Sequence, residues 1–289
     1  MVLARLPVFR IMEFNRNNDS SFFLSSNHGF AMFVLLTNDD GIHAEGLWAA
    51  AEELRQDRRV TRLEIIAPQV QQSGVSHSIT YLSPLVPTRA TVRGQSVWVV
   101  NGTPADCVKL GVMQLLDQRP DLVISGINEG LNTGINAIYS GTVAAAREAT
   151  FFRLPGVALS LEYAQEMGFS TAASISVPRV LGIIECMTLA SGGTGLLNVN
   201  IPQSAVSPED SAEKPIWKYV PMKLTRHDDP YVTGADPKQR HYYWSTDEPF
   251  VELPGADTDV DSIAAGAITV TPMSFDLNDY RMLQQLNQQ

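Results

Sequence analysis

Two adjacent carboxylates follow the first strongly apolar run of the sequence. Residues 33–36 are all apolar, and Asp39 and Asp40 come directly after them in the turn Asn38-Asp39-Asp40-Gly41. Neighbouring carboxylates repel each other, which raises a pKa unless a cation neutralises them. One interpretation of the pair is therefore a metal site. The other is a solvated turn, because Asp-Gly is a common turn dipeptide.

Two neutral oxygen donors follow other predicted strands. Ser73 lies in the loop Gln71-Gln72-Ser73-Gly74, and Asn128 follows the apolar run at 122–125. The carboxyl ends of parallel strands share one edge of a sheet, so these loops should converge with Asp39 and Asp40. An all-oxygen set suits Mg²⁺, Mn²⁺ or Ca²⁺ rather than Zn²⁺. Taken singly, either residue is more often a hydrogen-bonding loop residue than a ligand.

A third chemical feature is the sequence Ser140-Gly141-Thr142 at the start of a predicted helix. Free N–H groups and the positive end of the helix dipole favour an anion there, such as a phosphate. The alternative is an ordinary Ser N-cap before a helix of small residues. His77 lies in the loop of Ser73, and we expect either an approach to the site or a structural role.

Strand and helix patterns alternate from Met32 onward, which predicts an α/β fold with a parallel sheet. The predicted strands are 33–36, 63–67, 79–86, 96–100, 122–125, 157–161, 196–200 and 267–270, with a turn at 89–95 and a short aromatic strand at 241–244. The predicted helices are 44–55, 103–116, 141–150, 173–189 and 276–286.

The chain divides into four segments by composition and hydrophobic pattern. Residues 1–31 have no clear period and are read as an N-terminal extension. Residues 32–202 carry the alternating core, and 203–262 are rich in Pro, Asp and polar residues, as expected of extended excursions. Residues 263–289 supply a last strand and a closing helix that return to the core.

Composition excludes several classes of protein. The net charge is −10, from 21 Lys and Arg against 31 Asp and Glu, so we expect no long nucleic acid and no anionic membrane as partner. No apolar run reaches the length of a membrane span, and we expect a cytoplasmic protein. The two cysteines, Cys107 and Cys186, exclude a disulfide framework and are expected to be buried free thiols.

Five motifs occur in an order typical of one family. They are LLTNDDGIHAEGL, QQSGVSHSIT, VNGTPADCVKLG, ISGINEGLNTGINAIYSGTVAAAREA and TDVDSIAAGAITVTPMSFDL. From Met32 to Leu277 the chain resembles the SurE family, the survival-protein 5'/3'-nucleotidases. The resemblance implies a Rossmann-like core at 32–202 and an arm at 203–262 that exchanges between subunits of a homodimer or homotetramer. Asp229-Pro230 and Tyr242-Tyr243-Trp244 match the pattern of that arm.

The resemblance also implies roles for individual residues. The family's metal ligands fall on Asp39, Asp40, Ser73 and Asn128, which are the four oxygens collected above, and imply one Mg²⁺ or Mn²⁺ per subunit. Asn132 and Ser140-Gly141-Thr142 match the substrate-side loop. Asn136 departs from the family, since many members carry an acidic residue there.

These observations predict a divalent-metal-dependent phosphomonoesterase that hydrolyses nucleoside 5'- and 3'-monophosphates, with short-chain polyphosphate as a further candidate substrate. The metal would polarise the phosphoryl oxygens and lower the pKa of water, with Asp39 and Asp40 as the catalytic carboxylates. A nucleotide-binding regulator with weak turnover and a structural oligomer that binds metal without catalysis are the alternatives.

Overall fold

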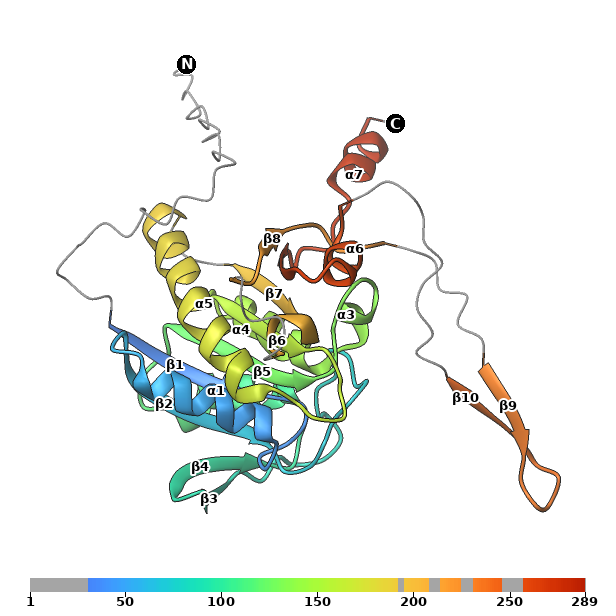
Figure 1. The fold of residues 1–289 in the computed structure, drawn as a ribbon, viewed down its shortest axis with the longest axis horizontal. Coiled ribbons are helices and arrows are strands. Elements are labelled where there is room, and N and C mark those ends of the chain that lie inside the picture. The colour runs from blue at the N-terminus through green and yellow to red at the C-terminus, as the bar shows by residue number, and fades with distance from the viewer. Residues whose placement is uncertain (1–30, 192–194, 208–213, 225–230, 246–256, 289) are drawn as a thin grey trace.

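The fold is built on one large sheet (Figure 1). The computed structural model describes residues 31–191, 195–207, 214–224, 231–245 and 257–288. In spatial order the nine strands are β3 (Thr88–Val92), β4 (Gln95–Val100), β2 (Val60–Pro68), β1 (Met32–Thr37), β5 (Leu122–Glu129), β6 (Gly156–Leu161), β7 (Leu196–Ile201), β11 (Ile268–Met273) and β8 (Trp217–Tyr219). The six strands from β4 to β7 are parallel, whereas β3 runs antiparallel to β4 and β11 antiparallel to β7. The predicted α/β class with a mostly parallel sheet is confirmed.

The order of the strands reverses direction between β1 and β5. From β1 the chain moves outward to β2 and β4 on one side, then returns to β5 on the other side. The last residue of β1, Thr37, lies opposite Ser125 of β5. In open α/β sheets the crevice beyond the carboxyl ends of the strands at such a switch point is where ligands bind.

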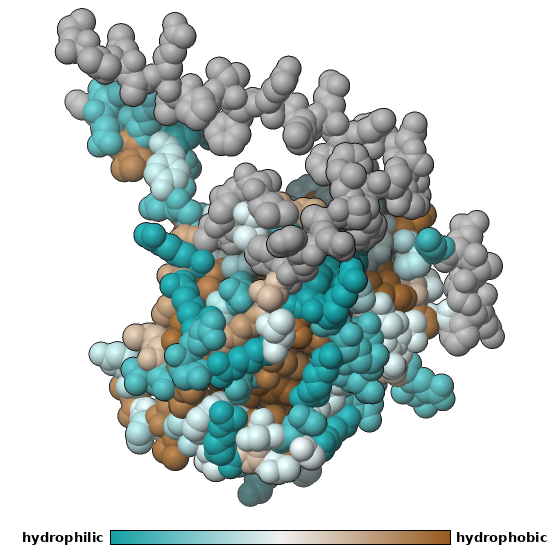
Figure 2. Space-filling model, turned by 90° about the vertical axis from the view of Figure 1, so that its left-hand side faces the viewer, coloured by the Kyte–Doolittle hydropathy of each residue, from teal (hydrophilic) through white to brown (hydrophobic). Residues whose placement is uncertain are grey.

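Helices cover both faces of the sheet because its central strands are apolar on both sides. Val34 and Leu36 of β1 pack with α1 (Glu45–Gln56) and α5 (Phe169–Ser191). Leu35 packs on the opposite face with α2 (Pro104–Leu110) and α4 (Gly141–Phe151). A continuous apolar run buried on both faces is what a central parallel strand requires. Figure 2 shows that apolar residues on one outer face of the molecule lie among hydrophilic ones.

Helix α2 begins with a complete cap. The Thr103 hydroxyl accepts the N–H of Asp106, and the Asp106 carboxylate accepts the N–H of Thr103. This reciprocal pair satisfies two N–H groups that would otherwise lack partners at the helix start. A π-helical turn, Gly111–Leu115, continues α2, so the helix predicted over 103–116 is confirmed.

The strand predicted over 79–86 is wrong. Tyr81 and Leu82 are 86% and 96% exposed, and side chains rather than a neighbouring strand hold the segment. The Thr80 N–H donates to Asp106, and the Val86 N–H donates to Asn101. The hairpin instead pairs β3 with β4 through Arg93 and Gly94, so the turn predicted at 89–95 is shorter than expected.

Backbone angles explain this tight turn. Arg93 and Gly94 have φ values of 49° and 77°, and two consecutive positive φ values are what a two-residue type I′ turn requires. Arg93-Gly94 is not the Asn-Gly or Asp-Gly pair that usually signals such a turn, which is why the sequence did not locate the two-residue turn within 89–95.

The C-terminal part of the chain both completes the core and extends beyond it. Strands β8 and β11 join the large sheet, while β9 (Tyr231–Ala235) and β10 (His241–Ser245) form a separate antiparallel pair that Figure 1 shows away from the sheet. The aromatic strand predicted at 241–244 is thus confirmed as β10. Helix α6 (Asp259–Ala264) precedes β11, and α7 (Tyr280–Leu286) begins later than the predicted 276. None of the residues of α7 is buried, so the last strand returns to the core as predicted but the closing helix does not.

Several expectations concern residues that the structure does not describe, or are corrected by it. Residues 1–30 of the predicted extension and Asp229-Pro230 lie outside the described ranges. Cys107 is buried as expected, but Cys186 is exposed; both thiols are free. Among the described helices, none combines the length and the apolar character needed to cross a membrane.

Glycine allows two helices to approach the strands closely. A Cβ on Gly156 would lie 1.9 Å from the carbonyl oxygen of Ala146 in α4, and a Cβ on Gly46 of α1 would lie 2.0 Å from that of Ile127 in β5. Both obstacles are backbone atoms that cannot rotate away. The close packing of α1 and α4 beside the strand ends therefore depends on these two residues.

We expect Gly46→Ala to lower the free energy of unfolding by about 2–4 kcal/mol, because the helix must move away from β5. Gly182→Ala in α5 is the matched control, since the nearest atom to its added Cβ is Arg59 Nη1 at 3.6 Å. Helix propensity alone should make that variant neutral or more stable by up to about 1 kcal/mol. Urea denaturation measures both; equal stability of the two variants would contradict the packing argument.

Candidate functional site

The loop after β1 contacts the loop that carries Ser73. The Gln72 N–H donates to the backbone carbonyl of Asp39 over 2.7 Å, and a Cβ on Gly41 would lie 3.2 Å from the carbonyl carbon of Val70. Ser73 follows Gln72 directly, is exposed, and its Oγ accepts a hydrogen bond from Gln71 Nε2 at 2.9 Å. The backbone thus places Ser73 next to the Asp39 loop, as the strand-end argument predicts.

The start of α4 lies against the Asp39 side chain. The Thr142 N–H donates to Asp39 Oδ2 at 3.1 Å, and the Thr142 hydroxyl donates to Asp39 Oδ1. Gly141 permits this approach, because a Cβ there would lie 2.9 Å from Asp39 Oδ2. Ser140 is the N-cap, and its Oγ accepts the Val143 N–H at 3.1 Å.

The end of β5 also contacts the carboxylate pair. The Glu129 N–H donates to Asp40 Oδ2 at 3.1 Å, and Asn128 precedes Glu129. The Asn128 amide nitrogen donates to the Gly130 carbonyl at 2.8 Å, which leaves Oδ1 as the acceptor of this side chain. The loops after β1 and β2, the end of β5 and the start of α4 are therefore linked by hydrogen bonds around Asp39 and Asp40.

The electrostatics of the pair are unfavourable without a cation. Burial raises the pKa of Asp39 despite its hydrogen bonds to Thr142, and Asp39 is only 4% exposed. Burial, followed by the negative charge of Asp39, raises the pKa of Asp40 to about 7. Two partly desolvated carboxylates favour their charged form when a positive charge lies between or beside them.

The donor set fits a hard divalent cation. In the ranges that the structure describes, no three His, Cys, Asp or Glu side chains cluster as a metal site would need. The candidate site therefore depends on two carboxylates together with the neutral oxygens of Ser73 and Asn128, a set that Mg²⁺ and Mn²⁺ accept. The buried Oδ1 of neighbouring Asn38 also has no hydrogen-bond partner.

Asn132, in the loop after β5, is held by neighbouring strands of the sheet. It is 7% exposed, its Nδ2 donates to Ser160 Oγ at 2.8 Å, and its backbone N–H donates to Asn200 Oδ1 at 2.8 Å. Its carbonyl oxygen accepts from the Asn198 amide at 2.7 Å. The side chain is therefore held by β6, and the backbone of Asn132 by β7.

Asp259 of α6 fixes the same loop, and the sequence reasoning missed it. Its fully buried Oδ2 accepts the N–H of Gly134, and its Oδ1 accepts the N–H of Lys223, at 2.8 and 2.9 Å. A buried carboxylate that accepts several backbone N–H groups holds them firmly in place. The signal available in the sequence was an acidic residue inside the motif TDVDSI.

His77 is attached to α4 through both ring nitrogens. Its Nε2 lies 2.7 Å from Glu148 Oε2, and its Nδ1 accepts a hydrogen bond from Arg147 Nε at 2.8 Å. Its ring stacks on Phe151 with centroids 5.3 Å apart. Of the two roles considered for His77, this geometry fits the structural one. The sequence did not identify Glu148 as the partner of His77. Its only signal was that it is a charged residue in a helix rich in alanine.

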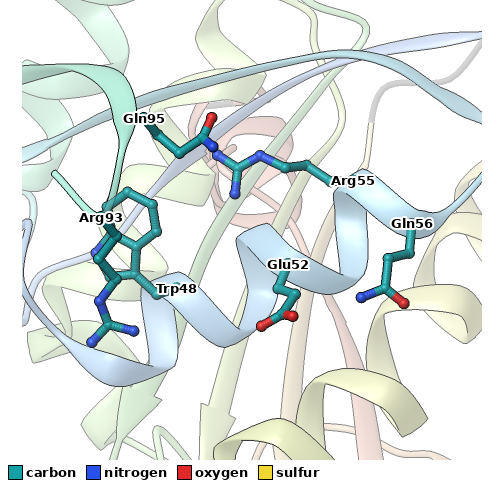
Figure 3. Close-up of a pocket in the computed structure, with 6 residues that line it drawn as sticks. All are labelled: Trp48, Glu52, Arg55, Gln56, Arg93 and Gln95. Carbon is teal, nitrogen blue, oxygen red and sulfur yellow. The ribbon is translucent and has the colours of Figure 1, made fainter. Parts of the chain in front are cut away.

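A surface hollow elsewhere contains none of the predicted site residues. It is lined by residues of α1 and of the β3–β4 turn, namely Trp48, Glu52, Arg55, Gln56, Arg93 and Gln95 (Figure 3). The guanidinium carbons of Arg55 and Arg93 lie 5.9 and 5.6 Å from the Trp48 ring centroid. Since these arginines cover an indole that is 5% exposed, packing accounts for their positions.

Fold and site together define a class: a doubly wound α/β protein with an acidic, oxygen-rich site at its topological switch point. Comparison with known proteins identifies the family. Residues 34–228 match the family model described as Survival protein SurE, and the chain belongs to this family.

The relatives match over most of their length. The chain is 44% identical over 261 residues to a protein from Rhodopirellula baltica named 5'-nucleotidase SurE, covering 88% of this chain and 97% of the relative. A protein of the same name from Desulfatibacillum aliphaticivorans is 41% identical, with 89% and 98% covered. The crystal structure of the SurE protein from Aquifex aeolicus superposes with a TM-score of 0.71 at 32% identity, covering 89% of this chain and 98% of that chain.

We expect Asp40→Asn to stabilise the metal-free protein at pH 8 by on the order of 1 kcal/mol, because it removes repulsion between Asp39 and Asp40 and keeps an acceptor for the Glu129 N–H. Thermal or urea denaturation in EDTA tests this. The exposed Glu166→Gln is the control and should leave stability within about 0.5 kcal/mol. A destabilised Asp40→Asn protein would show that the pair is not under electrostatic strain.

Proposed function

We propose that the chain is a divalent-metal-dependent phosphomonoesterase that hydrolyses nucleoside 5'- and 3'-monophosphates to nucleoside and phosphate, with short-chain polyphosphate as a further substrate. The observation that carries the proposal is the convergence of Asp39 and Asp40 with the loop after β2, the end of β5 and the start of α4. Membership of the SurE family, with relatives named 5'-nucleotidase, supports the substrate class.

One Mg²⁺ or Mn²⁺ per subunit would be held by Asp39, Asp40, Ser73 and Asn128. When bound, such an ion supplies charge stabilisation for phosphoryl oxygens and acidifies water. The local negative charge of the two carboxylates would then be neutralised, which lets an anionic substrate approach a protein of net charge −10.

The two carboxylates are suited to different tasks. Both oxygens of Asp39 accept hydrogen bonds from Thr142, so Asp39 is a fixed anchor. Within the described chain Asp40 accepts one hydrogen bond, through Oδ2 from the Glu129 N–H. Its Oδ1 is thus available to orient the attacking water or to take its proton, which is the role we assign to Asp40.

The phosphate side is assigned to Ser140, Gly141 and Thr142, with Asn132. The start of an eleven-residue helix points N–H groups and a positive dipole end toward this side of the pair. Thr142 already donates twice to Asp39, so its contribution is to hold that carboxylate, while Gly141 lets the start of α4 lie directly against Asp39. Asn132 is fixed by Ser160 and Asn200, which preorganises it.

The alternative is a regulator that binds nucleotide or metal and turns over weakly. Its motivation is Asn136, which starts the short helix α3 (Asn136–Tyr139) at a position where many family members carry an acidic residue. The rate of metal-dependent phosphate release from AMP distinguishes the two proposals, because the regulator would release phosphate only slowly.

Asp39→Asn should reduce Mn²⁺-dependent phosphate release from AMP about 100-fold or more, since it removes an anchoring ligand. EDTA should abolish release by the unmodified protein. Mn²⁺ should raise the melting temperature of the unmodified protein but not of the variant. The exposed Asp117→Asn is the matched control; equal turnover of both variants would remove Asp39 from the mechanism.

We further propose that the arm at 203–262 and the C-terminal helix join subunits into a homodimer or homotetramer. Tyr243 and Trp244 of β10 are 66% and 72% exposed, and Met282 and Leu286 of α7 are 57% and 58% exposed. Apolar side chains gathered on elements that project from the core are typical of surfaces buried by a partner.

Replacing Tyr243 and Trp244 together by serine should shift the mass measured by light scattering toward the monomer, because the variant removes the two most exposed aromatic side chains of the hairpin. Circular dichroism should remain unchanged if the core folds normally. Lys238→Ser, an exposed change in the same hairpin, is the control. An unchanged mass for the double variant would rule out the hairpin as an essential contact.

A further inference from the structure

The loop that carries Ser73 is held at two points. Before Ser73, the Gln72 N–H donates to the Asp39 carbonyl. After it, residues 76–77 are attached to α3 and α4. The Ser76 N–H donates to the Tyr139 carbonyl at 2.8 Å, and the Ser76 hydroxyl donates to the Ile138 carbonyl at 2.8 Å. The position of Ser73 therefore depends on how firmly the second attachment holds.

His77 provides the strongest contacts of this second attachment. Because Nδ1 accepts from Arg147, the ring's N–H is on Nε2 and donates to Glu148. The His77 and Glu148 side chains are 13% and 7% exposed. Such a bond to a buried carboxylate is short and charge-assisted, and loss of either partner leaves a buried polar group unsatisfied.

Aromatic rings cover the pair from outside. Phe151 of α4 stacks on the His77 ring, and Phe275 packs edge-on against Phe151 with centroids 5.4 Å apart. Water is thereby kept from part of the His77 ring, which strengthens the polar contacts beneath it.

We propose that His77 and Glu148 form a positioning clamp that fixes the 71–78 loop on α4 and so sets the place of Ser73 in the metal site. The inference rests on the proposed function for the metal, but the clamp itself is a property of the loop. His77 is a positioning residue, since both ring nitrogens face α4 and neither is directed to a reacting group.

The clamp makes a specific prediction for metal affinity. His77→Phe keeps an aromatic ring for Phe151 but loses both polar contacts, and should raise the Mn²⁺ dissociation constant about tenfold, the lower range for loss of a supporting contact. Glu148→Leu should do the same. Glu148→Gln keeps an acceptor for Nε2–H and should bind Mn²⁺ within about threefold of the unmodified protein.

The pair acts as a unit, so the double variant His77→Phe with Glu148→Leu should bind Mn²⁺ no more weakly than the weaker single variant. Saturating Mn²⁺ should restore kcat in all variants and leave the shape of its pH profile unchanged. Glu166→Leu, at an exposed position, is the control and should change neither affinity nor kcat.

Two measurements decide the proposal. Titration with Mn²⁺ gives the affinity, and amide hydrogen exchange of peptides covering 71–78 gives the loop's protection without any metal. Faster exchange confined to this loop in His77→Phe and Glu148→Leu supports the clamp. Unchanged exchange in these variants overturns the proposal. So does a lower kcat at saturating Mn²⁺ if the pH dependence of kcat also loses one of its two limbs, because His77 would then take part in the reaction.

The failure of the proposed function has a different signature. If the unmodified protein neither binds Mn²⁺ nor releases phosphate, the metal-dependent hydrolase is wrong, and the clamp is judged by hydrogen exchange alone. If the unmodified protein binds and releases normally while His77→Phe matches it in affinity and exchange, the clamp alone is wrong.

Discussion

Burial of two adjacent carboxylates, Asp39 and Asp40, is the constraint on which the arrangement of this site depends. Both carboxyl groups follow the end of β1. Burial raises the pKa of each, and the negative charge of Asp39 raises that of Asp40 further. Folding tolerates the cost because neighbouring elements supply donors: Thr142 to Asp39 and the Glu129 N–H to Asp40. These hydrogen bonds offset only part of the cost of burying the two charges, since the pKa values stay raised. A bound cation would offset the rest.

The site also requires helices α1 and α4 to lie unusually close to the strands and to Asp39. Three glycines meet this requirement at different levels: Gly46 under α1, Gly141 at the start of α4 and Gly156 beneath its middle. Each stands where a side chain would collide with another segment. The donors of α4 reach Asp39 because the helix can lie directly on the strands, so packing and electrostatics at this edge are not separable.

Much of this arrangement follows from the sequence, and the exceptions have physical causes. Apolar runs at 33–36 and 122–125 predicted β1 and β5, and strand-end logic brought Asp39, Asp40, Ser73 and Asn128 into one neighbourhood. The hairpin was misplaced because apolar residues at 79–86 imitate a strand, although side chains of Asn101 and Asp106 hold that segment. Partners such as Glu148 and Asp259 were missed, since pairing across 71 or 125 positions leaves no local pattern.

The contact between Asp259 and Gly134 bears on how the protein folds during its synthesis. A loop in the middle of the chain is tied down by a carboxylate 125 positions later, on α6. During synthesis the sheet from β1 to β7 can assemble on the ribosome before that carboxylate has emerged. The nascent chain would then pass through a stage in which Asp39 and Asp40 are in place but the loop around Gly134 is not yet held. The site would be complete only after α6 has been synthesised.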